Sequence, residues 1–452
     1  MTRYVIEGAQ VFDGEQPIGV RTVEIEGTRI VAVGAPTPAT AERIDGNGAT
    51  LLPGLIDAHT HADVETLGHA LRFGVTTEFD LFSFPHAMHP VRRASAERTD
   101  IADVRSSSVG LTAPGGHPTQ LHGGLNDPEL PTVTRPEDAA RFVDERIAEG
   151  ADYIKVLIES GETLGKTVPV IEERIVKAAV AAAHDRDRMV IAHALTLDAT
   201  WQALAAGVDG FAHLFIDGPA TPELIEAFRA GGTFLTPTLN LLASLTGRHL
   251  GADLAGDSRV TSRLPQPWTD NLSREFNTLP AGNFDDALAA VKAMHEAGVP
   301  ILAGSDANHH FGALGMAHGA SLHGELQLLV RAGLTPTEAL RAATSVPATT
   351  FGLHDRGRIA PGARRSPAGR RRSHQQDQRH PVDQGRVAQR YPGNSMRSPE
   401  PSLLTSGGQR RRSTATRSAM PGGSDRASRR AAGSSPARRS CRSAERAPRP
   451  QQ

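Results

Sequence analysis

Short apolar runs separated by turn residues dominate the first fifty residues. Runs at 4–8, 22–27 and 29–34 alternate or continue apolar side chains, and glycine or Asp-Gly steps punctuate them. Such runs bounded by turn signals are typical of short strands joined by hairpins. We therefore expect a small, β-sandwich-like sheet domain over residues 1–50, to which residues 351–363 return.

The pattern changes after residue 50, where continuous apolar strands alternate with helical stretches rich in Ala, Leu and Glu. Strands of this kind are buried on both faces, as in a parallel sheet covered by helices. Eight units over about 300 residues favour an α/β fold with a (β/α)₈ TIM barrel over residues 51–350, rather than an open doubly wound sheet. The strand candidates are 51–59, 74–82, 104–112, 153–158, 189–195, 208–215, 233–239 and 300–306. The helix candidates are 136–149, 172–185, 198–206, 222–230, 284–297, 319–331 and 335–344.

A long insertion follows the seventh strand candidate at 247–282. It is rich in polar and turn residues, which indicates a loop. Long loops at that end of a barrel usually carry function.

From Arg364 onward the chain loses its apolar periodicity. Residues 364–452 hold 21 Arg and no Lys against 5 acidic residues, a net charge of +16, whereas residues 1–363 carry −17. An Arg/Ser/Pro-rich segment without Ile, Phe or Trp cannot offset the entropy of ordering, so we expect disorder. The join is abrupt, and we interpret the segment as the product of a reading-frame shift near Arg364. An intact frame with homogeneous codon usage on resequencing the gene would contradict that interpretation.

Composition also bears on the compartment. No apolar run approaches the roughly 20 residues that span a bilayer. The first residues lack the apolar stretch and cleavage site of a signal peptide. Cys441 is the one cysteine, so no internal disulfide can form. We expect a cytoplasmic protein with no membrane partner.

A His-x-His pair ends the first barrel strand. Residues i and i+2 of an extended chain point to the same side, so His59 and His61 can both face the barrel axis at its carboxyl-terminal rim. Alone, this pair is a weak indication of a metal site.

A lysine inside the fourth apolar strand adds a second unusual feature. A bare ammonium at Lys155 would be costly to bury. Its side chain could snorkel to solvent from the strand end. Alternatively, CO₂ could carbamylate the amine and so make an anionic oxygen ligand able to bridge two cations.

Three further strands end in residues that can ligate a metal. His193 and His213 each end an apolar strand, and singly each could be a satisfied core histidine. Asp306 ends the eighth strand and could by itself be a helix N-cap. Together, however, strands 1, 4, 5, 6 and 8 all carry groups that bind Zn²⁺ or a similar ion at one rim. This arrangement predicts a two-metal site.

The order of these residues resembles the signature of the amidohydrolase superfamily. The most specific motif reads LPGLIDAHTH at 52–61, and further matches are GVTT at 74–77, GGH at 115–117, GADYIK at 150–155, AGLTP at 332–336 and AAT at 342–344. The branch it looks like contains imidazolonepropionase-related enzymes and metal-dependent dipeptidases acting on Xaa-Pro or Xaa-Arg. The resemblance covers about residues 3–363. The Gly-Lys-Ala-Asp-Leu-like strand that rejoins the small sheet in that family is absent, so we expect the sheet to be incomplete.

The resemblance implies a cofactor of two divalent ions, with zinc as the expected metal. One ion would be held by His59, His61 and Asp306 and the other by His193 and His213, with carboxylated Lys155 between them. A hydroxide bridging the two ions would be a nucleophile available at neutral pH.

Two residues are candidates for catalysis. Asp306 would accept the proton of the hydroxide and deliver it to the leaving nitrogen. His117 follows two glycines at the end of the third strand and could donate to the developing oxyanion. It could equally be an ordinary loop histidine.

The predicted activity is hydrolysis of a C–N bond in a small amide, cyclic amide or dipeptide-like compound. Phe82 and Phe84 would favour an apolar or aromatic group, although both could be ordinary packing. A urea, carbamate or ester hydrolase on the same metals is the alternative enzyme. Outside enzymes, the Arg runs at 370–372 and 410–412 could bind nucleic acid, but that tail has no Lys and no interleaved aromatic beyond Tyr391. An inactive product of the frame shift and a homo-oligomer also stay open.

Overall fold

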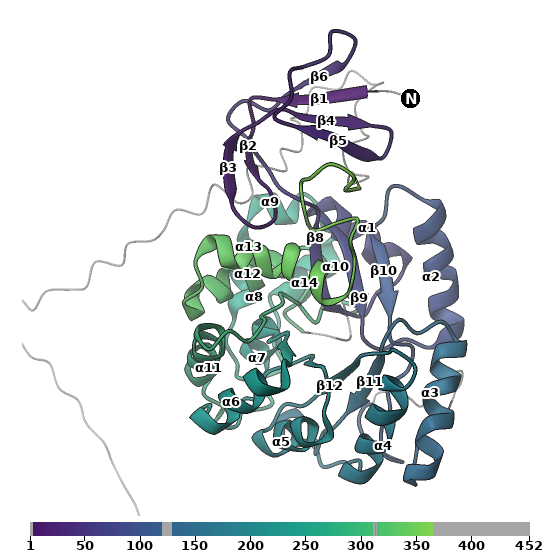
Figure 1. Cartoon of the computed structure of the whole chain (residues 1–452). Helices are drawn as coiled ribbons and strands as arrows, with labels where there is room; N and C mark the ends of the chain where they lie inside the picture. Colours follow the sequence, from purple (N-terminus) through teal and green to yellow (C-terminus); the bar gives the residue numbers. More distant parts are fainter. Residues whose placement is uncertain (1–2, 120–128, 311, 313, 365–452) are drawn as a thin grey trace, which may run out of the picture. The chain divides into compact units, whose positions relative to one another are not determined.

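Two groups of strands form the sheets of the computed structural model, which describes residues 3–119, 129–310, 312 and 314–364 (Figure 1). The predictions for 365–452, including the tail and Cys441, lie outside the described residues. All described residues belong to one compact unit, Met1–Pro392. The strands are β1 Arg3–Glu7, β2 Gln10–Phe12, β3 Pro17–Val20, β4 Val23–Glu26, β5 Arg29–Val33, β6 Glu42–Asp45, β7 Thr50–Leu51, β8 Leu55–Thr60, β9 Val75–Asp80, β10 Asp103–Ser106, β11 Ile154–Leu157, β12 Val190–His193, β13 Gly210–Phe211 and β14 Phe234–Leu235.

The first seven strands form two small sheets. Their orders are β5-β4-β1-β6 and β3-β2-β7, with antiparallel β4–β5 and β1–β4 pairs. The chain returns to this region near its last described residues: Ile30 N donates to Ala363 O at 2.9 Å, and Arg29 pairs antiparallel with Arg364. Ile359 and Ala363 join the apolar core of the small sheets because their side chains are buried against it.

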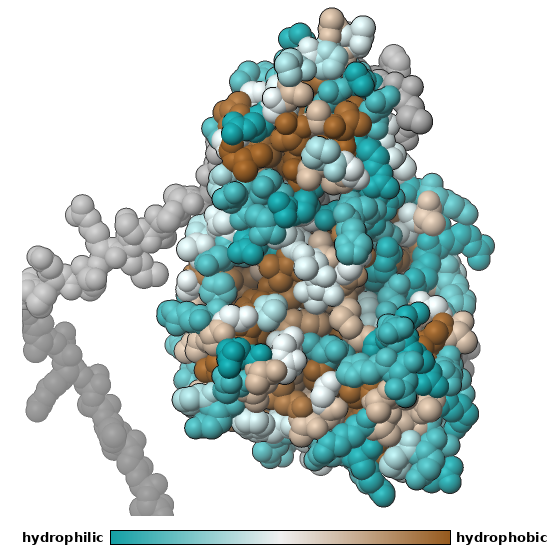
Figure 2. All heavy atoms as spheres, in the orientation of Figure 1, coloured by the Kyte–Doolittle hydropathy of each residue, from teal (hydrophilic) through white to brown (hydrophobic). Residues whose placement is uncertain are grey.

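Part of the apolar surface of these small sheets faces solvent. Figure 2 shows hydrophobic side chains gathered on one face of the part of the molecule that contains them. Among the described residues, Val20, Val31 and Ile44 are large apolar side chains with exposed fractions of 51%, 39% and 39%. Removing these side chains from water would be favourable, because the transfer of apolar surface out of water lowers the free energy.

The remaining strands are parallel and buried. They form the sheets β10-β9-β8 and β11-β12-β13-β14. Every residue of β8, β11 and β12 is buried, which matches the continuous apolar pattern of a sheet covered on both faces. Isolated parallel bridges continue the pairing beyond these sheets; they join Leu111 to Val156, Leu235 to Ile301 and Thr60 to Ala307.

Helices follow the parallel strands along the chain, and several begin at the polar residues that the sequence offers. Thr196 and Thr221 accept hydrogen bonds from the amides of Ala199 and Leu224. No described helix is long and apolar enough to cross a membrane. The helices are α1 Val64–Arg72, α2 Pro85–Glu97, η2 Pro136–Asp138, α3 Ala139–Ala148, η3 Glu162–Leu164, α4 Glu173–His184, α5 Leu197–Ala206, α6 Pro222–Gly231, α7 Leu239–Leu245, α8 Leu250–Gly256, α9 Ser258–Thr261, α10 Gln266–Leu272, α11 Phe284–Glu296, α12 Ala320–Ala332, α13 Pro336–Ala342 and α14 Ser345–Thr350.

The structure corrects several sequence predictions. The predicted strands 104–112 and 208–215 are limited to Asp103–Ser106 and Gly210–Phe211. The predicted strand 300–306 is not a regular strand, because this segment pairs only through isolated bridges at Ile301 and, just beyond it, Ala307. The predicted strand 233–239 ends at Leu235, because Thr238 adopts left-handed backbone angles and Leu239 begins α7. The insertion 247–282 is not a plain loop: it contains α8, α9 and α10, and the apolar residues Leu254, Val260 and Trp268 bury against α12 and Phe73. Its many polar residues concealed this short buried face.

Candidate metal centre

His59 and His61 converge on one carboxylate oxygen. The Nε2 atom of each ring lies 3.2 Å from Asp306 Oδ1. The pairing of β8 with β9 shifts register between Asp57 and Thr60, which re-aims the chain where His59 stands. The predicted convergence of these three side chains is therefore present. The alternation of side chains along the strand contributes to it, and so does the bulge in β8.

Each of these two rings is held by its other nitrogen. The carbonyl of Ala212 accepts a hydrogen bond from His59 Nδ1 at 2.8 Å, and that of Phe82 accepts one from His61 Nδ1 at 3.2 Å. A carbonyl oxygen only accepts, so both Nδ1 atoms carry a proton, and in the neutral form of each ring Nε2 keeps a lone pair. Those lone pairs are what a metal ion requires of a histidine.

His213 and His193 extend the cluster. The His213 ring centroid lies 4.6 Å from that of His59 and 4.6 Å from that of His193. The ligand atoms of His59, His213 and Asp306 all lie within 4.8 Å of one another, which is the spacing of a metal-binding group. His213 Nδ1 bonds to the hydroxyl of Thr238 at 2.8 Å, which leaves Nε2 toward the cluster.

Lys155 lies on β11 with only 2% of its surface exposed. Its strand neighbour is Ile191, two residues before His193. Within the described part of the chain, its amine makes no ion pair with a carboxylate. Burial lowers the pKa of Lys155 to about 7, although the charges of Asp306 and Asp80 act in the opposite direction. A substantial fraction of Lys155 therefore carries a neutral amine near neutral pH.

Burial favours neutral rings at His59 and His213, whereas the neighbouring Asp306 favours the charged ring at His61. Burial lowers the pKa values of His59 and His213 well below the usual histidine value. Burial also lowers the pKa of His61, but the hydrogen bond and charge of Asp306 outweigh it and the net pKa is raised. Burial would raise the pKa of Asp306, yet His59, His61 and Lys155 bring it down to about 2. Neutral imidazoles and an ionised carboxylate are the forms that ligate metals.

His117 also reaches this cluster. Its ring stacks on that of His193 with a centroid separation of 4.9 Å. Burial and the neighbouring His193 lower its pKa well below the usual value, so the ring is neutral and can donate one hydrogen bond.

Comparison with known proteins agrees with this chemistry. Residues 50–364 match the model of the amidohydrolase family. The chain belongs to the amidohydrolase family.

Individual proteins are similar to this amidohydrolase in sequence or in structure. An uncharacterized protein of Mycobacterium tuberculosis is 27% identical over 319 residues, covering 66% of this chain and 73% of that protein. The imidazolonepropionase of Streptomyces avermitilis is 26% identical over 383 residues, covering 77% and 81%. A crystal structure of a Xaa-Pro dipeptidase with bound methionine superposes with a TM-score of 0.63 at 20% identity, covering 80% of this chain and 92% of that one. The predictions of the amidohydrolase superfamily and of a metal-dependent hydrolase of C–N bonds are confirmed.

The sequence analysis of this amidohydrolase did not identify Glu159 as part of the cluster. Glu159 is buried just past β11, and its Oε2 accepts a hydrogen bond from His193 Nε2 at 3.1 Å. Its Oε1 accepts from the amide of Gly161 at 2.6 Å, which fixes the carboxylate. The bond places the His193 proton on Nε2 and leaves Nδ1 as its ligand atom. A carboxylate between an apolar strand and a Ser-Gly turn is the signal that could have revealed it.

Asp57 is a second buried carboxylate that the sequence interpretation passed over. It accepts hydrogen bonds from the amide of Ser305 at 2.9 Å and from its hydroxyl at 2.6 Å. Ser305 precedes Asp306, whose φ of +54° lies in the left-handed region. Asp57 thereby holds the turn that aims Asp306 at the histidines. Its position two residues before His59 on an apolar strand could have indicated such a role.

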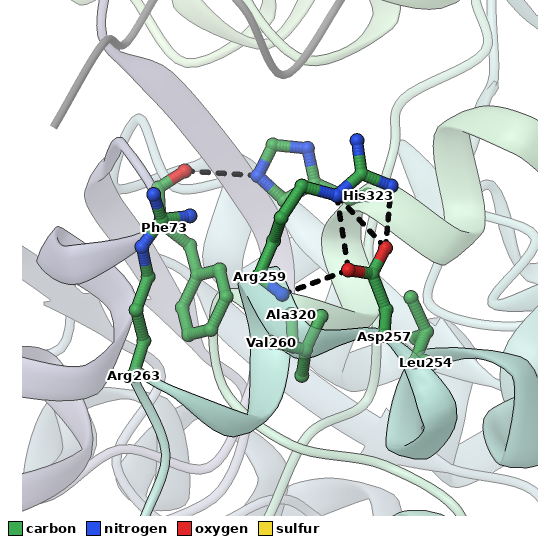
Figure 3. A pocket seen from close by; sticks show the side chains of 8 residues that line it. All are labelled: Phe73, Leu254, Asp257, Arg259, Val260, Arg263, Ala320 and His323. Carbon is green, nitrogen blue, oxygen red and sulfur yellow. Dashed lines mark hydrogen bonds and ion pairs between the residues drawn. The ribbon is translucent and has the colours of Figure 1, made fainter. Parts of the chain in front are cut away.

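A small cavity in the amidohydrolase lies apart from this cluster. Its volume of about 10 Å³ has room for one water molecule at most. Figure 3 shows the His323 ring facing the carbonyl of Phe73, with Arg259 paired to Asp257. Its lining residues are Phe73, Leu254, Asp257, Arg259, Val260, Arg263, Ala320 and His323. None belongs to the histidine cluster, so the cavity is no substrate site.

Proposed function

We propose that this amidohydrolase holds two divalent ions, zinc in the first instance, and hydrolyses a small amide, cyclic amide or dipeptide-like substrate. The observation that carries the proposal is the convergence of His59 Nε2 and His61 Nε2 on Asp306 Oδ1. The proposed ligands of one ion are these three residues, and those of the other are His193 and His213. Histidine nitrogens and one carboxylate form a donor set that suits zinc.

The proposal includes a closed (β/α)₈ barrel as the frame of the site. Support comes from three isolated parallel bridges. The bridge between Leu111 and Val156 joins the segment after β10 to β11, and the bridges from Leu235 to Ile301 and from Thr60 to Ala307 join each parallel sheet to the eighth segment. Hydrogen bonds from Ala58 N to Ala303 O at 2.9 Å and from Asp306 N to His59 O at 2.8 Å join the eighth segment to the first. Barrel enzymes carry their sites at the carboxyl ends of such strands.

Lys155 is the proposed bridging ligand after carboxylation. Its neutral amine would attack the carbon of CO₂, forming an N–C bond while one C=O electron pair moves to oxygen and a proton leaves for solvent. The resulting carbamate carries a negative charge that the bare amine lacks. Its buried position without a carboxylate partner, among the described residues, supports this role.

Bound divalent ions would polarise the substrate carbonyl and make water a nucleophile at neutral pH. The chain itself would move the proton. Asp306 Oδ1 is ionised and would accept it from the attacking water, then deliver it to the leaving nitrogen as the C–N bond breaks. His117, neutral beside His193, would donate a hydrogen bond to the oxyanion that develops on the carbonyl.

Substrate choice is proposed to involve the aromatic residues next to His61. Phe82 and Phe84 are half-buried, their ring centroids lie 6.3 Å apart, and the carbonyl of Phe82 holds His61. This placement supports an apolar or aromatic group on the substrate. The same observation favours aryl ureas as the second candidate class.

Elemental analysis and a substrate panel test the proposal together. We expect about two metal ions per chain and hydrolysis of some members of a panel of N-acyl amino acids, dipeptides and aryl ureas. A folded, metal-free protein that still hydrolysed its substrate would defeat the mechanism. Preference for polar over aromatic substrates would defeat the substrate assignment alone.

A further inference from the structure

The hydroxyl that holds His213 belongs to a residue in an unfavourable backbone conformation. Thr238 has φ +48° and ψ +52°, and its side chain is fully buried. The left-handed region is uncommon for non-glycine residues and especially so for a β-branched one. Only surrounding contacts can hold Thr238 there, and in this conformation its Oγ1 lies 2.8 Å from His213 Nδ1.

The carboxyl group of a residue on a distant helix clamps the next two residues. Glu325 lies on α12 with 0% exposure. Its Oε1 accepts from Leu239 N at 2.8 Å, and its Oε2 accepts from Asn240 N at 3.0 Å and Asn240 Nδ2 at 2.8 Å. Three donors thus fix one buried side chain and, through it, the backbone that follows Thr238.

The helix and the turn are packed closely enough to leave little freedom. A Cβ added to Gly324 would lie 3.0 Å from Asn240 Oδ1, so α12 could not carry a larger residue there without displacement. Asn240 Nδ2 also donates to Ser321 O at 3.0 Å, one turn earlier on the same helix. The clamp therefore has several anchors on α12.

We infer that Glu325 is a positioning residue for the metal centre, acting on His213 through the turn at Thr238. It touches neither the histidine nor the space between the ligands. Its role is to keep the Thr238 hydroxyl on His213 Nδ1 so that His213 Nε2 stays aimed at the ion. The inference rests on the proposed function, because it takes His213 to be a ligand.

Titration of the full-length protein with Co²⁺ tests the inference without using activity. Visible absorption of bound Co²⁺ reports the geometry of its ligands, and the titration gives its affinity. The variants are Glu325→Ala, Thr238→Ala and the double variant, with Glu325→Gln as the conservative change. His323→Ala is the matched control, since His323 lies on the same helix and its ring bonds to the Phe73 carbonyl instead.

We expect Glu325→Ala and Thr238→Ala each to weaken Co²⁺ binding by about 10-fold and to change the spectrum. The double variant should bind Co²⁺ no more weakly than the single variant with the lower affinity, because both changes interrupt the same chain of contacts from Glu325 through Thr238 to His213. Glu325→Gln, which keeps one acceptor oxygen, should lose less, and His323→Ala should bind as the wild type does.

Two results would overturn the inference while leaving the proposed function intact: Glu325 variants that melt cooperatively and bind Co²⁺ like the wild type, or losses that add in the double variant. If Glu325→Ala does not fold, wild-type affinity and spectrum in Glu325→Gln would overturn it. A folded wild type that binds no Co²⁺ would instead refute the metal centre, and the inference with it.

Discussion

His193 Nε2 lies 3.1 Å from Glu159 Oε2, and both side chains are buried. This contact fixes which nitrogen of His193 faces the other ligands. Metal-ligating histidines commonly donate their second N–H to a carboxylate, which orients the ring and raises its basicity. Glu159 is therefore as much a part of the proposed centre as the histidine it holds.

We predict that Glu159→Ala weakens metal binding by roughly 10–100-fold. The His193 ring would lose its fixed proton position and its orientation. Glu159→Gln keeps an acceptor and should lose less. Competition with a chelator measures the affinity. Exposed Glu162, three residues later on η3, provides the control Glu162→Ala. Equal affinities of Glu159→Ala and Glu162→Ala would contradict the assignment.

The carboxylation of Lys155 predicts that metal loading depends on CO₂. Apoprotein prepared with a chelator should regain less metal in CO₂-free buffer than in buffer with bicarbonate, because the bridging carbamate cannot form. Elemental analysis after gel filtration measures the difference. Lys155→Gln should lose the bicarbonate effect, whereas Lys166→Gln, an exposed lysine on the loop after η3, should keep it. If the wild type regains the same amount of metal with and without bicarbonate, carboxylation of Lys155 is refuted.

Asp306 is predicted to be indispensable to turnover. Asp306→Asn removes the proton acceptor as well as one metal ligand, so kcat should fall by about 10²–10⁴-fold. Metal content, measured on the same sample, separates the two contributions. Asp217→Asn, on an exposed loop residue, is the matched change outside the cluster. Wild-type kcat in metal-loaded Asp306→Asn would rule out its role in proton transfer.

Glu325 predicts a pH dependence of stability with a definite sign. Burial raises the pKa of Glu325 to about 8, although hydrogen bonds from Leu239 and Asn240 act against the rise. Between the unfolded value of 4.5 and 8, the folded state holds a proton that the unfolded state has released. The wild type therefore loses stability as pH rises through this window, and the loss levels off above about pH 8.

In Glu325→Gln this titration is absent. Denaturant unfolding at several pH values measures the free energy of unfolding. From pH 5 to pH 8, that of the variant should rise relative to that of the wild type, by about 1.4 kcal/mol per pH unit at most. A constant difference across that range would show that the carboxyl group ionises equally in both states.

The tail is predicted to be dispensable for the metal centre. All six proposed ligands, with Glu159, Asp57 and Glu325, precede Arg364. A chain ending at Arg364 should keep the metal content and the hydrolytic activity of the full chain. Gel-shift assays at several salt concentrations test nucleic-acid binding in parallel. Loss of metal on truncation would show that the tail supports the centre, and a DNA shift lost on truncation would support the alternative function.

The sequence alone determined the types of residue in the centre and their order along the chain. The predicted strand ends at His59, His193, His213 and Asp306 pointed to one site, because the parallel strands of a barrel end at a common rim. The sequence also predicted helices that match α3, α4, α5, α6, α11, α12 and α13, but not α1 or α2. The short helices within 247–282 were missed, because polar residues outnumber the few apolar ones that bury.

Only the tertiary structure decided how each ligand is aimed. The groups that hold the rings of His59, His193 and His213 are Ala212 O, the Glu159 carboxylate and the Thr238 hydroxyl, from other segments of the chain. Glu325 reaches Leu239 across 86 residues. Periodicity in a sequence reports which positions are buried, but hydrogen-bond partners are set by which segments meet in space. The candidate ligands were therefore predictable from the sequence, and the nitrogen that each histidine directs toward the cluster was not.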